Sequence, residues 1–435
     1  ECGMSEIRGS LLFEEIIMEN EQKTAGKIKK RAEELFEQIR EDRRYLHQIP
    51  EIGTDVPQTT AYICRRLDDM GIPWQSCGGP LSGKMTEDYI SAGFPRMERA
   101  TGVTAVIGKG GPCILLRADM DALPIKEEND LDFRSENGYG HMCGHDSHAA
   151  MLLGAARILK EMEDELEGTV KLMFQPGEET GAGARILVEN GVLENPKPDA
   201  AFGLHVQSVD PTGQVGYAVG VNSSSLDTFI VKIKGKGGHS SQPQLCVDPL
   251  MIMNQLYQAV NLLATREADP AAAVALTCGV AKGGTAVNII PDEAELHIGL
   301  RTQDVEAAAR LTRRIPELVD HYVKAWNGEY EMTVFHTPCT WTDETFCREA
   351  VPYISEIVGE DNVKQIPPMT GTEDFGYVTE QVPGMFAFIG AGAPGNAPLH
   401  SPRMVLDEAV LPIGAAVHAN VAVSWLRDHG REKKK

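Results

Sequence analysis

Three features are missing from this 435-residue sequence, and each absence excludes a class of protein. No apolar run reaches the roughly 18 residues that a transmembrane helix requires, so we expect no membrane span. Residues 1–20 lack a basic segment followed by an apolar core, so we expect no signal peptide and a cytoplasmic protein. The 9 cysteines are scattered and odd in number, which favours reduced thiols over a disulfide framework.

Positive charge is also scarce. Lys and Arg number 41 against 63 Asp and Glu, which gives a net charge of −22. Such a charge repels phosphate backbones and anionic lipid surfaces, so we expect no nucleic-acid partner and no membrane partner. The apolar share of 42% and the charged share of 24% are those of an ordinary globular protein, and the chain is long enough for two domains.

The first half of the sequence alternates between strands and helices. Four short apolar strands are expected, at residues 103–107, 113–116, 169–174 and 200–204. Helices are expected at residues 24–47, 57–70, 147–162 and 182–189, and the Gly- and Pro-rich residues 77–101 are expected to be an insertion or a long loop. Strands that are apolar along their whole length are typical of a largely parallel α/β sheet that is covered on both faces.

The middle of the sequence has a different rhythm. Strand, helix, strand, strand, helix and strand are expected at residues 228–234, 249–265, 273–280, 294–300, 305–324 and 331–335. This order is typical of a ferredoxin-like domain. A strand at 386–389 and a helix at 407–425 then return to the α/β pattern. We therefore predict a ferredoxin-like domain, residues 225–337, inserted into an α/β domain made of residues 24–224 and 338–430.

Side chains that bind metals cluster next to the predicted strands and helices. Cys143 and His145 lie in His-Met-Cys-Gly-His-Asp-Ser-His at residues 141–148, which places a thiol and an imidazole on either side of one glycine. Ligands of open α/β sheets collect at the carboxyl ends of strands, so clusters that are distant in sequence can converge there. The alternative is a polar loop whose histidines cap the next helix, and it explains so dense a cluster less well.

Two adjacent glutamates follow the strand expected at 169–174. In Gln-Pro-Gly-Glu-Glu-Thr-Gly at residues 175–181, Glu178 and Glu179 point in different directions, so one can bind a metal while the other faces a substrate water. The alternative is a pair of surface glutamates in the first turn of a helix, where the helix dipole favours negative charge. Taken alone, this motif favours the alternative.

Other polar residues near strand ends are weaker candidates. His205 ends an apolar strand, where a lone histidine is more often structural than a ligand. Asp119 and Asp121 follow another strand and could orient a metal-binding histidine. His400 follows a strand and the glycine-rich residues 390–395, which match the dinucleotide-binding pattern. A phosphate-binding loop must open a helix, and the residues after 395 do not, so we interpret that segment as a turn.

Together these segments resemble a family of metallopeptidases and amidohydrolases that includes aminoacylases, carboxypeptidase-G-type enzymes and hippurate hydrolases. The similarity runs from about His47, in His-Gln-Ile-Pro-Glu-Ile-Gly, to the closing helix. Arg-Ala-Asp-Met-Asp-Ala-Leu-Pro at 117–124 and Cys-Gly-His-Asp at 143–146 resemble the branch of indole-acetyl-amino-acid, N-acyl-amino-acid and aminobenzoyl-glutamate hydrolases. The sequence departs from this branch at Gly177, where alanine is usual, and in the longer insertion at 77–101.

The resemblance implies a metal site at the carboxyl ends of the parallel strands of a catalytic domain. It implies two divalent metal ions per subunit, bound by Cys143, His145, Glu179, His205 and His400. A thiolate ligand favours zinc, and the other ligands also suit manganese, cobalt or nickel. Glu178 would be the general base, and Asp121 would be the acid that orients a ligand.

The resemblance also assigns roles to the inserted domain, which would be a lid and the contact surface of a homodimer. His239, in Gly-Gly-His-Ser, would reach the partner's active site. Asn288 and Arg301 would bind the carboxylate of the substrate, and Gly371 and Thr372 would line the amino-acid pocket.

These assignments predict a hydrolase that releases a free amino acid from an N-acyl or N-aroyl amino acid by attack of water. A dipeptidase or an aminobenzoyl-glutamate hydrolase would use the same site. A non-catalytic metal-binding protein is the alternative from another class, and it would require the loss of the base or of a ligand.

Overall fold

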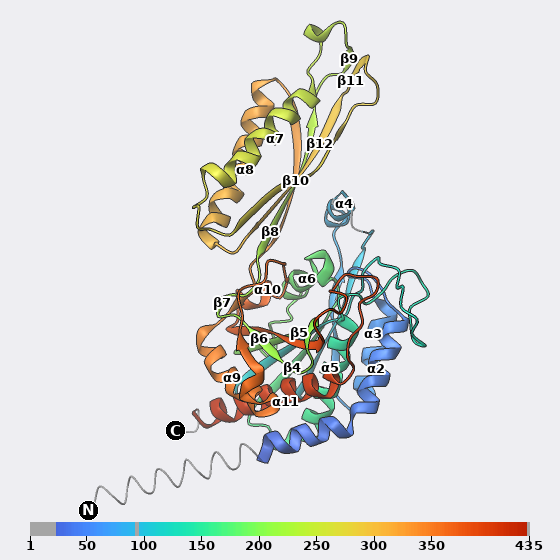
Figure 1. Cartoon of the computed structure of the whole chain (residues 1–435), viewed down its shortest axis with the longest axis vertical. Coiled ribbons are helices and arrows are strands. Elements are labelled where there is room, and N and C mark those ends of the chain that lie inside the picture. The colour runs from blue at the N-terminus through green and yellow to red at the C-terminus, as the bar shows by residue number, and fades with distance from the viewer. Residues whose placement is uncertain (1–22, 92–94, 433–435) are drawn as a thin grey trace, which may run out of the picture.

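The computed structural model describes residues 23–91 and 95–432, and it divides into a large α/β domain and a small one (Figure 1). The prediction that residues 1–20 contain no signal peptide falls outside the described residues. Within the described ranges, no helix combines the length and the apolar character that crossing a membrane requires.

The large domain contains a mixed sheet. In spatial order its eight strands are β1 (Trp74–Pro80), β2 (Arg99–Gly108), β4 (Thr169–Gln175), β3 (Cys113–Asp119), β5 (Ala200–Pro211), β16 (Gly384–Gly392), β6 (Val215–Tyr217) and β15 (Val363–Gln365). The four central strands, from β4 to β16, are parallel to one another, and antiparallel pairs occur toward both edges. The largely parallel α/β sheet predicted from the sequence is confirmed.

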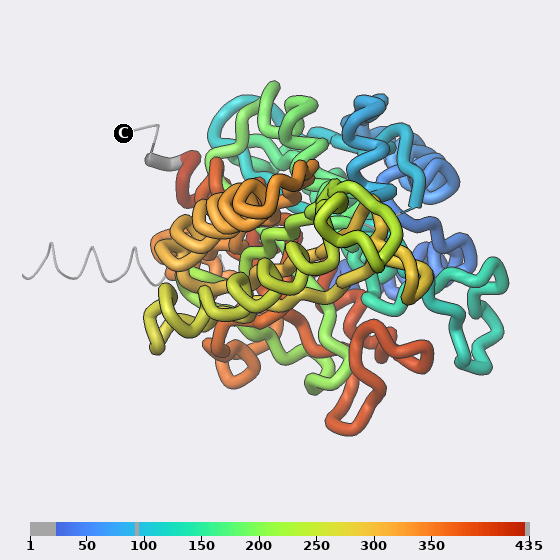
Figure 2. The backbone as a smooth tube through the Cα atoms, turned by 90° about the horizontal axis from the view of Figure 1, so that it is seen from above, coloured from blue at the N-terminus to red at the C-terminus, as the bar shows by residue number. Residues whose placement is uncertain are grey.

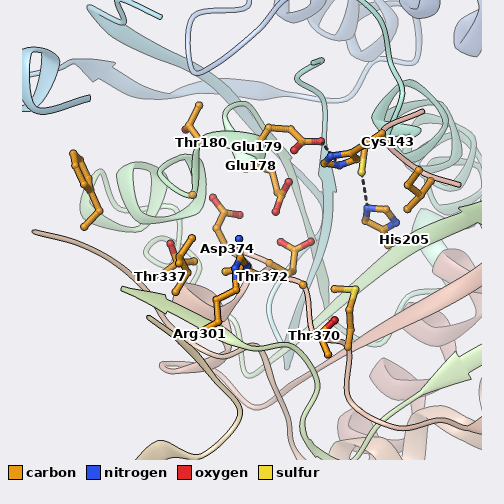
Figure 3. A pocket seen from close by; sticks show the side chains of 18 of the residues that line it. Cys143, Glu178, Glu179, Thr180, His205, Arg301, Thr337, Thr370, Thr372 and Asp374 are labelled. Carbon is orange, nitrogen blue, oxygen red and sulfur yellow. Dashed lines mark hydrogen bonds and ion pairs between the residues drawn. The ribbon is translucent and has the colours of Figure 1, made fainter. Parts of the chain in front are cut away.

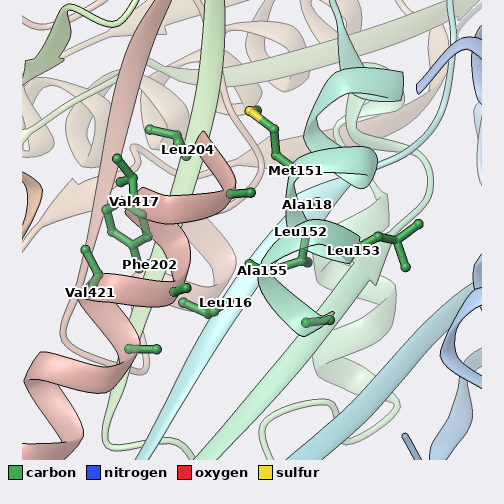
Figure 4. Packing of buried hydrophobic residues seen from close by; sticks show 14 of the residues in the cluster. Leu116, Ala118, Met151, Leu152, Leu153, Ala155, Phe202, Leu204, Val417 and Val421 are labelled. Atoms are coloured by element: carbon green, nitrogen blue, oxygen red, sulfur yellow. The ribbon is translucent and has the colours of Figure 1, made fainter. Parts of the chain in front are cut away.

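Helices cover both faces of this sheet because neighbouring residues of its strands are buried on opposite sides. In β3, Leu116 packs in the core under one face and Leu115 in the core under the other. The first face is covered by α2 (Phe36–Gln48), α3 (Pro57–Asp69), α5 (His145–Glu161), α9 (Glu344–Val358) and α11 (Val410–Glu432). The second is covered by α6 (Gly183–Glu189) and α10 (Gly376–Thr379). Figure 4 shows α5 and α11 packed against the first face around Phe202 and Leu116.

The small domain is a four-stranded antiparallel sheet with two helices on one face. Its strands, in spatial order, are β10 (Val274–Gly283), β12 (Glu293–Thr302), β8 (Ser225–Lys234) and β13 (Glu329–Thr337). The helices α7 (Pro249–Arg266) and α8 (Val305–Ala325) lie side by side over it (Figures 1 and 2). Leu311, Ile315 and Val319 recur every fourth residue on α8, so they form one apolar stripe against the sheet. The predicted ferredoxin-like pattern is confirmed.

Three expectations about local structure are wrong in part. Residues 77–101 are not a single loop, because β1 and β2 extend into this segment and α4 (Gly83–Ser91) lies between them. His205 lies inside β5 rather than at its end, because β5 continues to pair with β16 as far as Pro211. The turn interpretation of residues 390–395 is right only in part, because residues 390–392 belong to β16. No helix follows directly after this strand, so the segment is not a phosphate-binding loop.

Candidate metal centre and active site

A pocket of about 530 Å³ lies where the small domain faces the carboxyl ends of the central strands. Eight of the predicted site residues line it: Cys143, Glu178, Glu179, His205, Arg301, Gly371, Thr372 and His400. Figure 3 shows Glu178 near the middle of this pocket, with Cys143 and His205 on one side and Arg301 on the other. Asp121 and His145 are buried beside it. His239 and Asn288 do not line it.

The loop that opens α5 positions Cys143 and His145. Gly144 lies between them with a φ of +88°, and a Cβ atom at this position would lie 2.4 Å from Val206 Cγ2. Only glycine tolerates both the left-handed backbone and this close approach. The turn brings Cys143 Sγ to 3.5 Å from His205 Nε2.

Asp121 holds the backbone of the two adjacent glutamates. Its Oδ1 accepts the N–H of Glu178 at 3.0 Å, and its Oδ2 accepts the N–H of Glu179 at 3.2 Å. The preceding Gly177 has a φ of +76°, and a Cβ atom there would lie 2.5 Å from Thr54 Cγ2. The glycine that departs from the usual alanine therefore matches the backbone that this chain adopts.

Ligand atoms from distant segments converge around Glu179. The nearest ligand atoms of Cys143, Glu179 and His400 lie within 4.8 Å of one another, and the same holds for His145, Glu178 and Glu179. Glu179 Oε1 lies 3.3 Å from His400 Nε2 and 3.9 Å from His145 Nε2. His400 has a φ of +64°, an uncommon backbone conformation of the kind that is often found at functional sites.

Several of these atoms are buried without a hydrogen-bond partner among the described residues. They are both ring nitrogens of His145 and Oε1 of Glu179. Burial lowers the pKa of His145, but the carboxylates of Asp119, Asp121 and Glu179 outweigh it and raise the pKa to about 10. Buried polar atoms that make no hydrogen bond are costly, so an arrangement of this kind favours a bound cation.

The charges around the pocket also favour a cation. Burial, together with the nearby Glu373 and Glu179, raises the pKa of Glu178 well above its usual value. Burial and the charge of Glu179 do the same for the pKa of the Cys143 thiol. A divalent ion beside these groups would stabilise their ionised forms. Soft sulfur, imidazole and carboxylate donors in one place fit a transition-metal ion or zinc.

His205 and His148 have different roles, although the centres of their rings lie only 4.4 Å apart. His205 Nδ1 lies 2.7 Å from the carbonyl oxygen of Val206, which can accept its N–H and leave Nε2 available toward Cys143. His148 Nδ1 is paired with Asp119, and its Nε2 accepts the N–H of Val206 at 2.9 Å. Both nitrogens of His148 are therefore engaged, and this histidine supports the strand that carries His205.

The sequence analysis missed a buried network around Arg117. Its guanidinium donates to Asp119 Oδ2 at 2.8 Å, to Glu373 Oε1 at 2.8 Å and to Asp374 Oδ1 at 3.2 Å. Arg117 also donates to the side chain of Gln175 at 2.9 Å. The network ties the ends of β3 and β4 to the 371–375 loop and neutralises carboxylates beside Glu178. An arginine within an otherwise apolar strand was the signal for it, since such a charge requires buried partners.

Arg301 and Thr372 meet on the other side of the pocket. Arg301 Nη1 donates to the hydroxyl of Thr372, which joins β12 of the small domain to the 371–375 loop of the large one (Figure 3). The guanidinium is partly buried, which lowers the pKa of Arg301. An arginine in this position can hold a carboxylate by paired hydrogen bonds.

His239 and Asn288 lie together at the far end of the small domain. His239 belongs to β9 (Gly238–His239), which pairs with β11 (Ile289–Ile290) at the end of this domain that points away from the large domain (Figure 1). The backbone N–H of Ser240 donates to the carbonyl oxygen of Asn288 at 3.2 Å. Both predicted residues are exposed, and neither reaches the pocket of its own chain.

Known proteins resemble this chain over most of its length. Residues 115–424 match the family described as Peptidase family M20/M25/M40. The chain is 35% identical over 396 residues to IAA-amino acid hydrolase ILR1-like 4 of Arabidopsis thaliana. The matched region covers 88% of this chain and 84% of that protein. It is 34% identical over 398 residues to N-acetyl-L-cysteine deacetylase of Bacillus subtilis (strain 168), with coverages of 90% and 89%.

The fold is similar to that of a solved Bacillus subtilis protein described as a dinuclear metal binding peptidase from the M20 family. The TM-score is 0.70 at 30% identity, and the similarity covers 91% of this chain and 99% of that chain. The family resemblance inferred from the sequence motifs is thus confirmed. The chain belongs to peptidase family M20/M25/M40 and is a hydrolase that acts on amide bonds.

Proposed function

We propose that this protein is a dinuclear-metal amidohydrolase that releases a free amino acid from an N-acyl or N-aroyl amino acid. The observation that carries the proposal is the convergence of five potential ligands beside Glu178, in a pocket whose other side presents Arg301. Relatives described as an IAA-amino acid hydrolase and an N-acetyl-L-cysteine deacetylase support this class of substrate.

Cys143, His145, Glu179, His205 and His400 would hold two divalent metal ions. When bound, such ions lower the pKa of a water molecule and polarise the carbonyl group of the substrate. Zinc or manganese fits this donor set, and cobalt or nickel is also compatible with it. Asp121 would keep the ligands in place, because it fixes the backbone of Glu178 and Glu179 and lies 3.4 Å from His145 Nδ1.

Glu178 would act as the general base. Its carboxylate lies among the ligands without being needed as one, so it can take a proton from the attacking water. It would then deliver that proton to the amide nitrogen as the carbon–nitrogen bond breaks. The burial that raises its pKa suits a group that must hold a proton between these two steps.

Arg301 would select substrates that carry a free carboxylate. The guanidinium faces the pocket beside Thr372 and Gly371, opposite the cluster of ligands. A carboxylate held there places the amide of an N-acyl amino acid toward Glu178. A charge-assisted pair of this kind contributes roughly 1.5–3 kcal/mol to binding.

His239 and Asn288 would act in a second copy of the chain, within a homodimer formed by the small domains. The backbone N–H of Ser241 donates to His239 Nδ1 at 3.1 Å, so in neutral histidine the proton lies on Nε2. Nε2 can then donate to the oxyanion that forms when water attacks the amide carbon. Asn288, next to β11, would assist Arg301 in holding the carboxylate.

The proposal is tested by a substrate panel with free and blocked carboxylates. N-acetyl and N-benzoyl amino acids, aminobenzoyl-glutamate and dipeptides should be assayed next to the corresponding C-terminal amides. We expect metal-stripped protein to be inactive, zinc or manganese to restore turnover, and the blocked amides to react at least about 10-fold more slowly because they lose the pair with Arg301. If blocked and free substrates react equally, the carboxylate assignment is wrong.

Replacement of Cys143 by serine should lower metal content as well as rate. A thiolate ligand contributes binding free energy that the harder, weakly acidic hydroxyl does not replace. Metal per chain should be measured after dialysis against limiting zinc. Cys113→Ser is the matched control, because Cys113 is also a buried thiol but lies on β3 outside the pocket. Equal metal content in both variants would show that Cys143 is an ordinary buried cysteine.

A further inference from the structure

The segment between β1 and β2 carries a helix toward the small domain. The backbone N–H of Leu81 donates to the carbonyl oxygen of Glu98 at 2.8 Å, which closes the base of this excursion. Within it, the Thr86 hydroxyl donates to the carbonyl oxygen of Met97 at 2.8 Å, which fixes α4 against the returning chain. Figure 1 shows α4 projecting from the edge of the large domain, on the side that faces the small domain. Helix α4 therefore belongs to the surroundings of the pocket.

One side of α4 contacts β13 of the small domain. The ring of Tyr89 lies 4.9 Å from the ring of Phe335, with an angle of 43° between the ring planes. The Thr333 hydroxyl donates to Asp88 Oδ1 at 3.4 Å. Tyr89 also belongs to the same buried apolar cluster as Ala182, three residues after Glu179. The helix thus shares a core with the segment that follows the two glutamates and contacts the opposite domain.

Tyr89 and Phe335 form part of the lining of the pocket, and we call this pair the aromatic wall. Thr337, two residues after Phe335 on β13, also lines the pocket. Figure 3 shows Thr337 and Arg301 on one side of Glu178, and Cys143 and His205 on the other. The Phe335 end of β13 therefore enters the pocket from the side that carries Arg301, away from the ligand cluster.

We propose that the aromatic wall contacts the side chain of the amino acid to be released and makes the enzyme prefer large apolar or aromatic side chains. This inference rests on the proposed function. If the substrate carboxylate binds Arg301 and the amide lies near Glu178, the α-carbon lies between these two residues. The side chain on the α-carbon is then the part of the substrate that lies on the Arg301 side of the pocket. The acyl group continues from the carbonyl carbon, on the side of the ligand cluster.

The physical basis is the burial of apolar surface against the ring of Phe335, which packs on the 3% exposed ring of Tyr89. Aromatic pairs gain stability beyond the area that they bury, and a substrate side chain placed against Phe335 would exchange water for ring contacts. Even one methylene group in an apolar pocket changes kcat/KM by roughly 10- to 200-fold. Loss of one ring of the wall should therefore reduce the preference for a large side chain by at least about 10-fold.

The test uses two series of N-acyl amino acids, one that varies only the amino acid and one that varies only the acyl group. In the first series the acyl group is acetyl, and the amino acid is phenylalanine, leucine or alanine. In the second series the amino acid is alanine, and the acyl group is acetyl or benzoyl. For Tyr89→Ala and Phe335→Ala we expect the phenylalanine-to-alanine ratio of kcat/KM to fall about 10-fold or more, with the benzoyl-to-acetyl ratio unchanged.

Two further variants separate this role from a structural one. Tyr89→Phe keeps the ring, so it should keep the wild-type ratios in both series. Ile90→Ala is the matched control, because Ile90 lies next to Tyr89 on α4, is 37% exposed and does not line the pocket. It should change neither ratio. Metal content and the melting temperature should be measured for all variants, because they show whether each variant is folded. If Tyr89→Ala does not fold, Phe335→Ala decides the test.

The outcomes separate the two proposals. If the wild-type protein hydrolyses no N-acyl amino acid in either series, the proposed function fails. If it is active but both ring-deleting variants keep the phenylalanine-to-alanine ratio, the aromatic wall does not select the amino acid. A change confined to the benzoyl-to-acetyl ratio would also overturn the proposal, because it would place the acyl group at the wall.

Discussion

Glu178→Gln should lose most of its activity and keep its metal. Glutamine preserves the size of the side chain and one hydrogen-bonding oxygen, but it cannot accept and deliver a proton. Proton transfer by a positioned side chain contributes about 10²–10⁴-fold to rate, so we expect kcat to fall by that factor. The backbone N–H of residue 178 would still donate to Asp121, so the ligand cluster should persist.

The measurement is kcat on an N-acyl amino acid, together with metal per chain. Glu189→Gln is the matched control, because Glu189 is a glutamate of α6 that pairs with Arg185 at 2.9 Å and does not line the pocket. It should retain near wild-type turnover. Survival of activity within a few-fold in Glu178→Gln would show that another group takes the proton. A parallel loss of metal would make Glu178 a ligand rather than a base.

Most of the fold could be predicted because its strands and helices carry strong apolar patterns. Leu115 and Leu116 of β3 pack in two different cores, and such two-sided burial appears in the sequence as a continuous apolar run. The segment around α4 could not be predicted in this way. Its strand β1 is rich in glycine, serine and proline, and its pairing with β2 depends on a distant partner rather than on local propensity.

The candidate site was predictable where its residues are adjacent in sequence, and less so where folding brings them together. The spacing of Cys143 and His145 indicated a metal site by itself. Glu178 and Glu179 alone favoured a pair of surface glutamates, and only the family resemblance assigned them roles. Two partners of Arg117, Glu373 and Asp374, lie more than 250 residues away in the sequence, so no local pattern could identify them. His148 belongs to the same motif as His145, yet only its contacts with both Asp119 and the backbone of Val206 distinguish its role.

His239 does not line the pocket of its own chain. It is exposed at the far end of the small domain, so within its own chain it has no substrate to act on. Ser241 nevertheless orients its ring so that Nε2 can carry a proton. The simpler interpretation is a turn histidine in solvent. The interpretation that follows from the family resemblance is a donor to the active site of a second copy.

Mixing two inactive variants should restore activity if His239 acts in the partner's site. His239→Ala removes an oxyanion donor, which typically costs about 10²–10³-fold in turnover, and Glu178→Gln removes the base. In a mixed dimer, the site that retains Glu178 receives His239 from the other chain. One of the two sites of the dimer is therefore complete. Random exchange would make about half of the dimers mixed, and activity should return to about one quarter of the wild-type value.

Exchange should be verified with two differently tagged chains, and each variant mixed with itself should stay inactive. If mixed dimers form and remain inactive, His239 does not act across the dimer, and the exposed end of the small domain has another role.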